Sequence, residues 1–328
     1  MAAIAAGEFP VEPAMPICDA HHHLWQRAGE RYLLENLLDD IAGGHNVVAT
    51  VAVECKAMYR TEGREDLKPI GETEFLEGVA KEAVANPGIG TAVGAAIVGF
   101  ADLTLGDGVA AVLEAHLAAS PRRFRGIRYS TTYDPSGALR NDSSRNMMSE
   151  TAFRRGFRLL KRFNLSFDAW LYHPQLLELA ALAHAFPDVV IILDHIGGPL
   201  GTGPYAGRRD EVFDAWHREI GKVAECPNVM VKLGGLGSER SGFHWHQRSA
   251  PPLAEEIAAA IKPYFEFCIE KFGASRCMFE SNFPVEKRAN TYLALWNAFK
   301  LMTASFSPGE RAALFHDTAF RVYRLAPE

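Results

Sequence analysis

Cysteine is scarce in this chain, with five in 328 residues and no closely spaced pair among them. An odd, sparse set of this kind argues against a disulfide framework. Sparse, unpaired thiols are typical of a reducing compartment. We therefore expect a cytoplasmic protein.

Basic residues are also in deficit, with 34 lysines and arginines against 40 acidic residues and a formal net charge of -6. This balance argues against nucleic acid or an anionic membrane as a partner. No apolar run approaches the roughly 18 residues that a membrane span needs. Residues 1–16 carry prolines and acids but no basic segment, so we expect a flexible lead-in rather than a signal peptide.

Several motifs that define large enzyme classes are missing. There is no Gly-x-Ser-x-Gly segment and no phosphate-binding Walker loop, which excludes serine hydrolases of that type and P-loop nucleotidases. No Gly-x-Gly-x-x-Gly turn follows the first apolar run, which argues against a dinucleotide-binding sheet.

What the chain does have is a regular alternation of short apolar runs and longer helical patterns. Runs such as VVIIL are continuous and rich in β-branched residues, as expected for parallel strands covered on both faces. Eight such strands are predicted, at residues 17–20, 47–53, 91–98, 124–129, 165–171, 189–193, 229–233 and 277–279.

Eight strand-then-helix units in a chain of this length favour an α/β fold of the (β/α)8 barrel type. No linker interrupts the pattern, so we expect one barrel domain over residues 17–328 after the lead-in 1–16. Three long loops, at 56–74, 130–149 and 234–252, follow predicted strands. In a barrel they lie at the carboxyl end of the strands, where they can cover a site.

The first strand ends in the segment DAHHHLW. Because side chains alternate along a strand, Asp19, His21 and His23 are expected on one side and His22 on the other. Two imidazoles spaced in this way can converge on one metal ion or one substrate oxygen. A cluster of purely structural histidines is the alternative.

Two further strand ends carry candidate site residues. His195 follows the run VVIIL, at the strand end where barrel enzymes hold catalytic groups. Arg128 ends the fourth strand and suits capture of a substrate carboxylate, with a surface ion pair as the alternative.

The fifth strand, LSFDAWLYHPQ, offers Tyr172 or His173 as a substrate contact, because the sequence does not say which set of side chains faces inward. Glu54 and Lys232 each lie in a predicted buried strand and must be paired there. They are candidate substrate-binding residues, or else form an ion pair with one another inside the barrel.

In chain order, the segments DAHHHLW, RGIRY, LSFDAW, ILDHIGGP, VKLGGLG and MFESNFPVEK resemble the amidohydrolase superfamily, amidohydrolase-2 type. Within it they are most similar to the branch of 2-pyrone-4,6-dicarboxylate lactonase and the sugar-acid lactonases. The resemblance implies a barrel hydrolase that opens a carboxylated lactone. It also implies that His195 contacts the substrate carbonyl or a metal, and that His21, His23 and His195 would be the ligands if a metal such as zinc is bound.

The eighth strand departs from that pattern. The superfamily places an aspartate where this chain has Asn282, and an amide is a poor base and a poor zinc ligand. Another carboxylate could be the base, with Glu280 first and Glu54 or Glu286 as alternatives. Otherwise Asn282 orients water or substrate while a neutral histidine takes the proton, or hydrolysis has been lost.

Together these observations predict a lactonase-like hydrolase with no obligatory cofactor, and a divalent metal such as zinc as an option. The alternatives are a zinc-dependent hydrolase or decarboxylase of the same superfamily, and a non-catalytic small-molecule binder. The expected partner is a small carboxylated substrate, and association into a homo-oligomer is compatible with the sequence.

Overall fold

Eight parallel strands form the centre of the protein in the computed structural model, which describes residues 8–27 and 29–325. They make one sheet in the order β1-β4-β5-β6-β7-β8-β9-β10, so each strand pairs with the next one of the sheet along the chain. The strands are β1 Pro16–His22, β4 Asn46–Val53, β5 Ala92–Gly99, β6 Phe124–Ser130, β7 Ser166–Trp170, β8 Ile191–Leu193, β9 Val229–Leu233 and β10 Cys277–Phe279.

The sheet curls until its two edges meet. His22 of β1 forms a parallel bridge with Phe283, four residues beyond the end of β10. The backbone N–H of Asn282 donates to the carbonyl of His21 at 2.8 Å, and that of His23 donates to Phe283 at 2.8 Å. This seam closes the strands into a barrel and confirms the predicted fold class.

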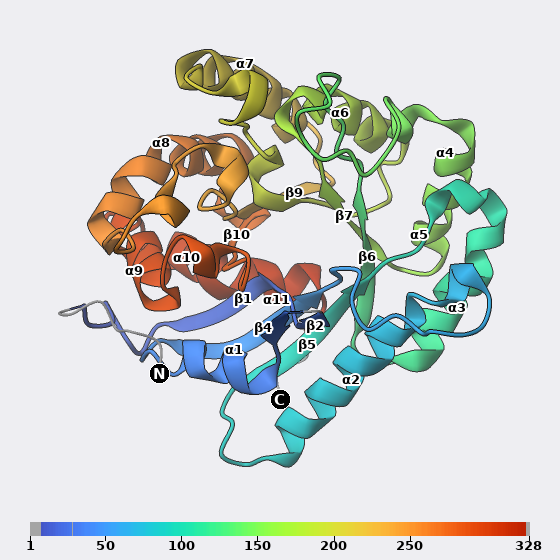
Figure 1. Ribbon diagram of the computed structural model, residues 1–328, viewed down its shortest axis with the longest axis horizontal. Coiled ribbons are helices and arrows are strands. Elements are labelled where there is room, and N and C mark those ends of the chain that lie inside the picture. The colour runs from blue at the N-terminus through green and yellow to red at the C-terminus, as the bar shows by residue number, and fades with distance from the viewer. Residues whose placement is uncertain (1–7, 28, 326–328) are drawn as a thin grey trace.

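Helices surround the barrel (Figure 1), because each crossover between parallel strands carries a helix back along the outside. They are α1 Leu34–Ile41, α2 Ile70–Ala85, α3 Val109–Ala119, α4 Thr151–Phe157, α5 Leu159–Arg162, α6 Leu176–Ala185, α7 Arg209–Ala224, α8 Ala254–Phe272, α9 Tyr292–Met302, α10 Pro308–Ala312 and α11 Thr318–Val322. The described residues contain no helix with the length and apolar character needed to cross a membrane.

The core has two parts. The large part lies between strands and helices, and a smaller cluster fills the barrel itself, with Cys18, Val51, Ile192 and Met278 among its members. Tyr323, just after α11, belongs to the inner cluster and is fully buried. Its hydroxyl donates to Asp168 of β7 at 2.6 Å, so the last helical segment plugs one end of the barrel.

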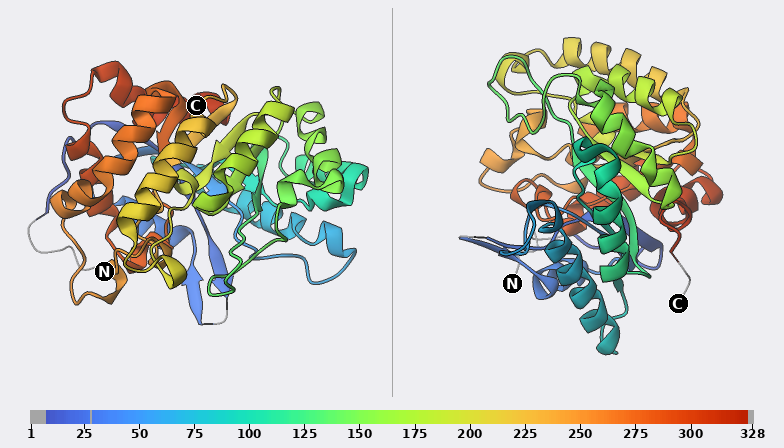
Figure 2. Two further views of the ribbon diagram at one scale, coloured as in Figure 1. Left: turned by 90° about the horizontal axis from the view of Figure 1, so that it is seen from above. Right: turned by 90° about the vertical axis from the view of Figure 1, so that its right-hand side faces the viewer.

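Three elements near the N-terminus were not predicted. The strands β2 Trp25–Arg27 and β3 Glu30–Tyr32 form an antiparallel hairpin that projects from the barrel (Figure 2), and α1 follows it. Three-residue strands are too short to give a periodic signal in sequence.

Part of the predicted lead-in lies among the described residues and contacts α9. Residues 1–7 lie outside the described residues. Beyond them, Val11 donates through its backbone to Asn297 Oδ1 at 2.8 Å, and the Lys300 ammonium donates to the carbonyls of Val11 and Glu12 at 2.9 and 2.8 Å. The described part of the lead-in is therefore attached to α9 before β1 begins.

Candidate active site

The triple histidine of β1 does not follow simple alternation. Asp19 accepts hydrogen bonds from the Tyr292 hydroxyl of α9 at 3.1 Å and from the Ser281 N–H at 2.8 Å, outside the barrel. His21 lies inside it, so the expectation that Asp19 shares a side with His21 and His23 is wrong. The pairing with β4 shifts register between Asp19 and His22, and such a shift reverses the side on which the following residues lie.

His21 and His23 nevertheless meet. Their Nε2 atoms are 3.1 Å apart, and Nδ1 of His23 donates to the carbonyl of Val53 at 2.8 Å. Burial, and then the neighbouring His21, hold the pKa of His23 well below its usual range. A neutral His23 that donates through Nδ1 must accept through Nε2, so His21 is the donor within this pair.

His195 and Glu280 form the second pair. Nδ1 of His195 lies 2.6 Å from Oε1 of Glu280, and the backbone N–H of His195 donates to the same oxygen at 3.2 Å. Burial lowers the pKa of His195. Burial also opposes ionisation of Glu280, but attraction and hydrogen bonds from His195 and His21 outweigh it and bring that pKa to about 2. The arrangement is a neutral imidazole oriented by a carboxylate, with Nε2 free to accept a proton.

The backbone around His195 is strained in a way that serves this orientation. His195 and Ile196 have φ angles of 53° and 50°, in the left-handed region that L-residues rarely adopt. The turn directs the His195 ring to the carboxyl end of the barrel, where it contacts Trp170 with ring centroids 4.9 Å apart.

Lys232 lies beneath the histidines and is fully buried. Its ammonium is 2.7 Å from Asp168, 3.1 Å from Asp194 and 3.1 Å from Nδ1 of His21. Burial alone would lower the pKa of Lys232. The negative charges of Asp168 and Asp194 have the larger effect and raise this pKa to about 12. The alternative of a Glu54–Lys232 ion pair is wrong, and Lys232 does not reach the pocket.

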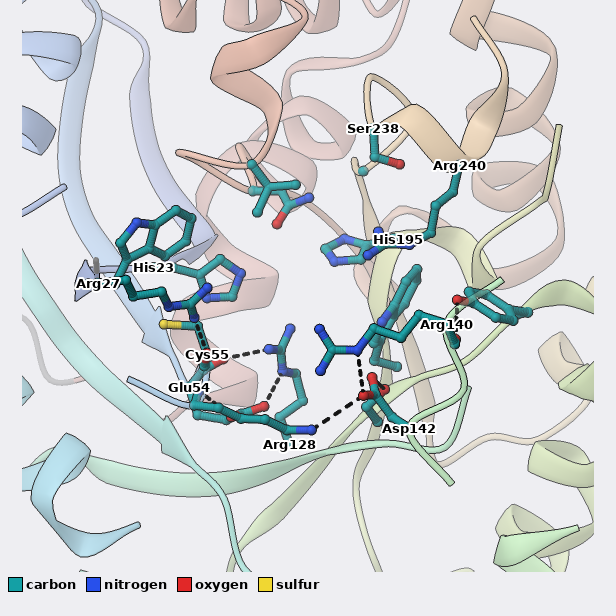
Figure 3. A pocket seen from close by; sticks show the side chains of 18 residues that line it. His23, Arg27, Glu54, Cys55, Arg128, Arg140, Asp142, His195, Ser238 and Arg240 are labelled. Atoms are coloured by element: carbon teal, nitrogen blue, oxygen red, sulfur yellow. Dashed lines mark hydrogen bonds and ion pairs between the residues drawn. The ribbon is translucent and has the colours of Figure 1, made fainter. Parts of the chain in front are cut away.

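Glu54 pairs with Arg128 instead. Nε of Arg128 donates to Oε1 of Glu54 at 2.8 Å, and a terminal nitrogen donates to the Glu54 carbonyl at 2.5 Å. Both side chains line the pocket, and in Figure 3 the guanidinium group of Arg128 points to its centre. Arg128 therefore balances the negative charge of Glu54, whereas the nearest acid to Lys232 is Asp168.

The two candidates from the fifth strand are separated. Tyr172 lines the pocket, and its hydroxyl donates to the carbonyl of Arg140 at 2.8 Å. His173 does not line it: Nδ1 of His173 accepts from the Leu200 N–H at 3.4 Å, and the ring packs against Tyr205. The predicted substrate contact for His173 therefore has no support in its position.

Asn282 also lines the pocket and has a φ of 53°. Asparagine tolerates this left-handed conformation better than most residues. Glu280, two residues earlier, is fully buried, does not line the pocket and contacts His195 and His21. Glu280 is therefore a buried hydrogen-bond partner of His195.

The pocket has a volume of about 170 Å³ and is lined in part by the three long loops that we expected to cover the site. Sequence alone could indicate those loops but not which of their residues point inward. The lining residues that we did not predict are Trp25, Arg27, Cys55, Lys56, Ser130, Arg140, Asp142, Trp170, Gly235, Ser238, Arg240 and Val285.

A cation would find nitrogen and oxygen ligands in this site. Ligand atoms of His21, His195 and Glu280 lie within 4.8 Å of one another, and all three residues are buried. Oε2 of Glu280 lies 3.1 Å from Nδ1 of His21, so the carboxylate reaches both histidines. Histidine with a carboxylate suits zinc, so the residues fit such an ion, with Glu280 in the place that we predicted for His23.

Relatives of the chain are found among curated proteins. It is 35% identical over 331 residues to the uncharacterized protein y4mH of Sinorhizobium fredii, covering 94% of this chain and 98% of that one. It is 28% identical over 330 residues to the L-fucono-1,5-lactonase of Burkholderia ambifaria, covering 94% and 95%.

Solved structures share the fold. An amidohydrolase from Burkholderia multivorans, crystallised with bound zinc, superposes with a TM-score of 0.72 at 24% identity, covering 95% of this chain and all of that one. A putative 2-pyrone-4,6-dicarboxylic acid hydrolase from Pseudomonas putida gives a TM-score of 0.62 at 15% identity, covering 95% and 98%.

The amidohydrolase family model matches residues 18–325. This span runs from the first strand of the barrel to the end of the described residues. It includes the histidines, the carboxylates and the loops of the pocket, so the chain belongs to the amidohydrolase family and is a hydrolase.

Proposed function

We propose that this hydrolase opens a lactone, the internal ester of a small carboxylated molecule, by attack of water. The observation that carries the proposal is the His195–Glu280 pair at the floor of an arginine-rich pocket. Curated relatives named as lactonases support an ester of this kind.

His195 is the general base in this proposal. Its Nε2 takes a proton from water as the oxygen attacks the lactone carbonyl carbon, while Glu280 holds the opposite nitrogen and stabilises the imidazolium. The bond between that carbon and the ring oxygen then breaks, and His195 returns the proton to the ring oxygen. The product is an open hydroxy acid.

Asn282 takes part in the reaction in this scheme. Its side-chain amide lines the pocket and can donate a hydrogen bond to the developing oxyanion or orient the water. Of the alternatives that the sequence left open, the structure favours a neutral histidine as base over Glu280, because Glu280 does not line the pocket.

The charge of the pocket supports an anionic substrate. Five cations and two acids line it, an excess of three positive charges; the cations are Arg27, Lys56, Arg128, Arg140 and Arg240 and the acids are Glu54 and Asp142. Arg128 pairs with Glu54, whereas Arg140 and Lys56 pair with Asp142.

Arg27 and Arg240 have no acidic partner among the described residues. Each lies over an indole ring, with Arg27 4.7 Å from Trp25 and Arg240 5.6 Å from Trp170. We therefore propose that Arg240, in addition to Arg128, contacts the substrate carboxylate, because its guanidinium has no acidic partner among the described residues.

A zinc-dependent hydrolase or decarboxylase is the second candidate, favoured by the clustering of His21, His195 and Glu280. A divalent cation held there would act as a Lewis acid toward the carbonyl or carboxylate of the substrate. We propose that such an ion is not obligatory, because Lys232 already places a buried positive charge beside His21 and an amide occupies position 282.

The test is a substrate panel of carboxylated lactones, pyrone carboxylates and neutral sugar lactones, with ring opening followed as acid release. We expect turnover of at least one carboxylated lactone and its loss in His195→Asn. A folded protein that turns over none of them, but is stabilised by one that it leaves unchanged, would instead be a small-molecule binder.

A further inference from the structure

The segment GGLG after β9 lies directly against the site. A Cβ atom at Gly234 would lie 2.3 Å from Cγ of Glu280, and one at Gly235 would lie 2.5 Å from Cβ of His195. At Gly237 it would lie 2.1 Å from Oε2 of Glu286. Three glycines thus allow the main chain to approach three different acidic or histidine side chains, of which Glu286 has no role in the chemistry above.

Glu286 joins the two loops that follow β9 and β10. Its Oε2 accepts from the backbone N–H of Gly237 at 2.7 Å, and its own backbone N–H donates to the carbonyl of Asn282 at 3.1 Å. The side chain is 1% exposed and does not line the pocket. It therefore cannot reach a bound substrate.

The residues on either side of this link do reach the pocket. Ser238 and Arg240 follow Gly237 on the β9 loop, and Asn282 and Val285 precede Glu286. Figure 3 shows Ser238 and Arg240 at one side of the pocket, above His195. The link at Gly237 is therefore one of the contacts that hold this loop, beside the hydrogen bond from the Gly201 N–H to the Arg240 carbonyl at 2.7 Å.

We propose that Glu286 is a positioning residue, which holds the β9 loop through Gly237 so that Ser238 and Arg240 face the substrate. Its part in substrate affinity rests on the proposed function, whereas its hold on the loop does not. This assignment replaces the earlier alternative of Glu286 as a general base.

The hydrogen bond does not require a charge. Burial raises the pKa of Glu286 to about 7, although the Gly237 N–H lowers it in part, so both protonation states are populated near neutral pH. Either state can accept from Gly237. A glutamine can do the same through its carbonyl oxygen, whereas an alanine leaves the buried N–H without a partner.

The test compares Glu286→Gln and Glu286→Ala in the full chain by amide hydrogen exchange of residues 234–242 and by steady-state kinetics. We expect Glu286→Ala to speed exchange in this segment about tenfold, as for one lost hydrogen bond, and Glu286→Gln to stay near wild type. With a substrate in hand, KM should rise about tenfold in Glu286→Ala and kcat should change little.

Glu239→Ala is the matched control, because Glu239 is an acid on the same loop whose side chain is 60% exposed. If Glu286→Ala is too unstable to study, Gly237→Ala should accelerate the same exchange, since its Cβ displaces the carboxylate. Unchanged exchange in both variants would overturn the proposal. So would a collapse of kcat in Glu286→Gln, which would mark a base. The exchange result stands even if no lactone is turned over.

Discussion

The Nδ1 atom of His195 lies 2.6 Å from Oε1 of Glu280, and this oxygen also accepts a hydrogen bond from the backbone N–H of His195. The two residues are 85 positions apart in the chain and follow β8 and β10, two strands that β9 separates in the sheet. Because the carboxylate occupies one ring nitrogen, the proton on the histidine is fixed and the other nitrogen faces the pocket. Most of the predictions below test this relationship or the charges around it.

Glu280→Gln should leave the fold intact and remove most of the activity. An amide no longer stabilises the imidazolium and can hold the ring in the wrong tautomer, so we expect kcat to fall by about 10²- to 10⁴-fold. Steady-state kinetics with a thermal melt checks this. A variant with kcat within a few-fold of wild type would show that Glu280 does not act through His195.

Arg240→Gln should weaken binding of carboxylated lactones and spare neutral ones. A charged hydrogen bond contributes about 1.5–3 kcal/mol, which predicts a rise in KM of roughly 10- to 100-fold for the carboxylated compound. Arg248→Gln is the control, since Arg248 lies on the same loop and pairs with Glu256 away from the pocket. Equal effects on charged and neutral substrates would contradict an anion contact.

Removal of metal should leave most of the activity. We expect a protein purified with chelator, and shown by elemental analysis to lack zinc and manganese, to keep a kcat within about threefold of the untreated enzyme, well short of the loss of a catalytic group. Loss of activity that zinc restores would favour the metal-dependent alternative instead.

Asn282→Asp should fold normally, because aspartate also tolerates a φ of 53°, whereas Asn282→Ala should lose about 1–2 kcal/mol of stability. The new carboxylate would line the same pocket as His195 and should bind zinc more tightly than wild type in calorimetry. If the variant also gains activity with zinc, the amide weakens an inherited metal site. If activity falls, the amide contributes directly to the reaction.

Stability should decline as the pH falls from about 6.5 toward 4. Burial lowers the pKa of His116 and of His173 to about 4, so each stays neutral in the folded state while the unfolded chain takes up protons near pH 6.5. A histidine with a lowered pKa contributes stability above the unfolded value and loses it as the pH drops. Urea unfolding at several pH values measures this decline.

His116→Gln should reduce that slope by the contribution of one histidine, and His244→Gln, at an exposed position of the β9 loop, should not. Glu72 and Glu286 work in the opposite direction, since burial raises their pKa values to about 8 and 7. What these two glutamates contribute to the free energy of unfolding falls as the pH rises from about 4.5 to 8. Each variant must therefore be compared with wild type at the same pH.

The barrel and much of the candidate site could be predicted because the signals are local. Continuous β-rich runs such as VVIIL predicted eight strands, and the barrel has eight. Parallel strands in a barrel end on the same face. The sequence therefore predicted, without any knowledge of the packing, that the side chains at these strand ends would lie close together: His21, His23, Arg128 and His195.

The tertiary structure decided what depends on register and on distance across the barrel. Alternation along β1 placed Asp19 beside His21, but a register shift that no local pattern encodes put the two on opposite sides. A buried charge must be paired, yet only the packing shows that Lys232 pairs with Asp168 and that Glu54 pairs with Arg128.

Sequence by itself thus determined the family, the barrel and the end of the barrel where the candidate site lies. The tertiary structure decided that Glu280 supports His195 from below, that Asn282 lines the pocket, and that Glu286 joins two loops. The physical reason is that the strand pattern follows from hydrophobic burial along one segment, whereas each of these roles follows from a contact between segments far apart in the chain.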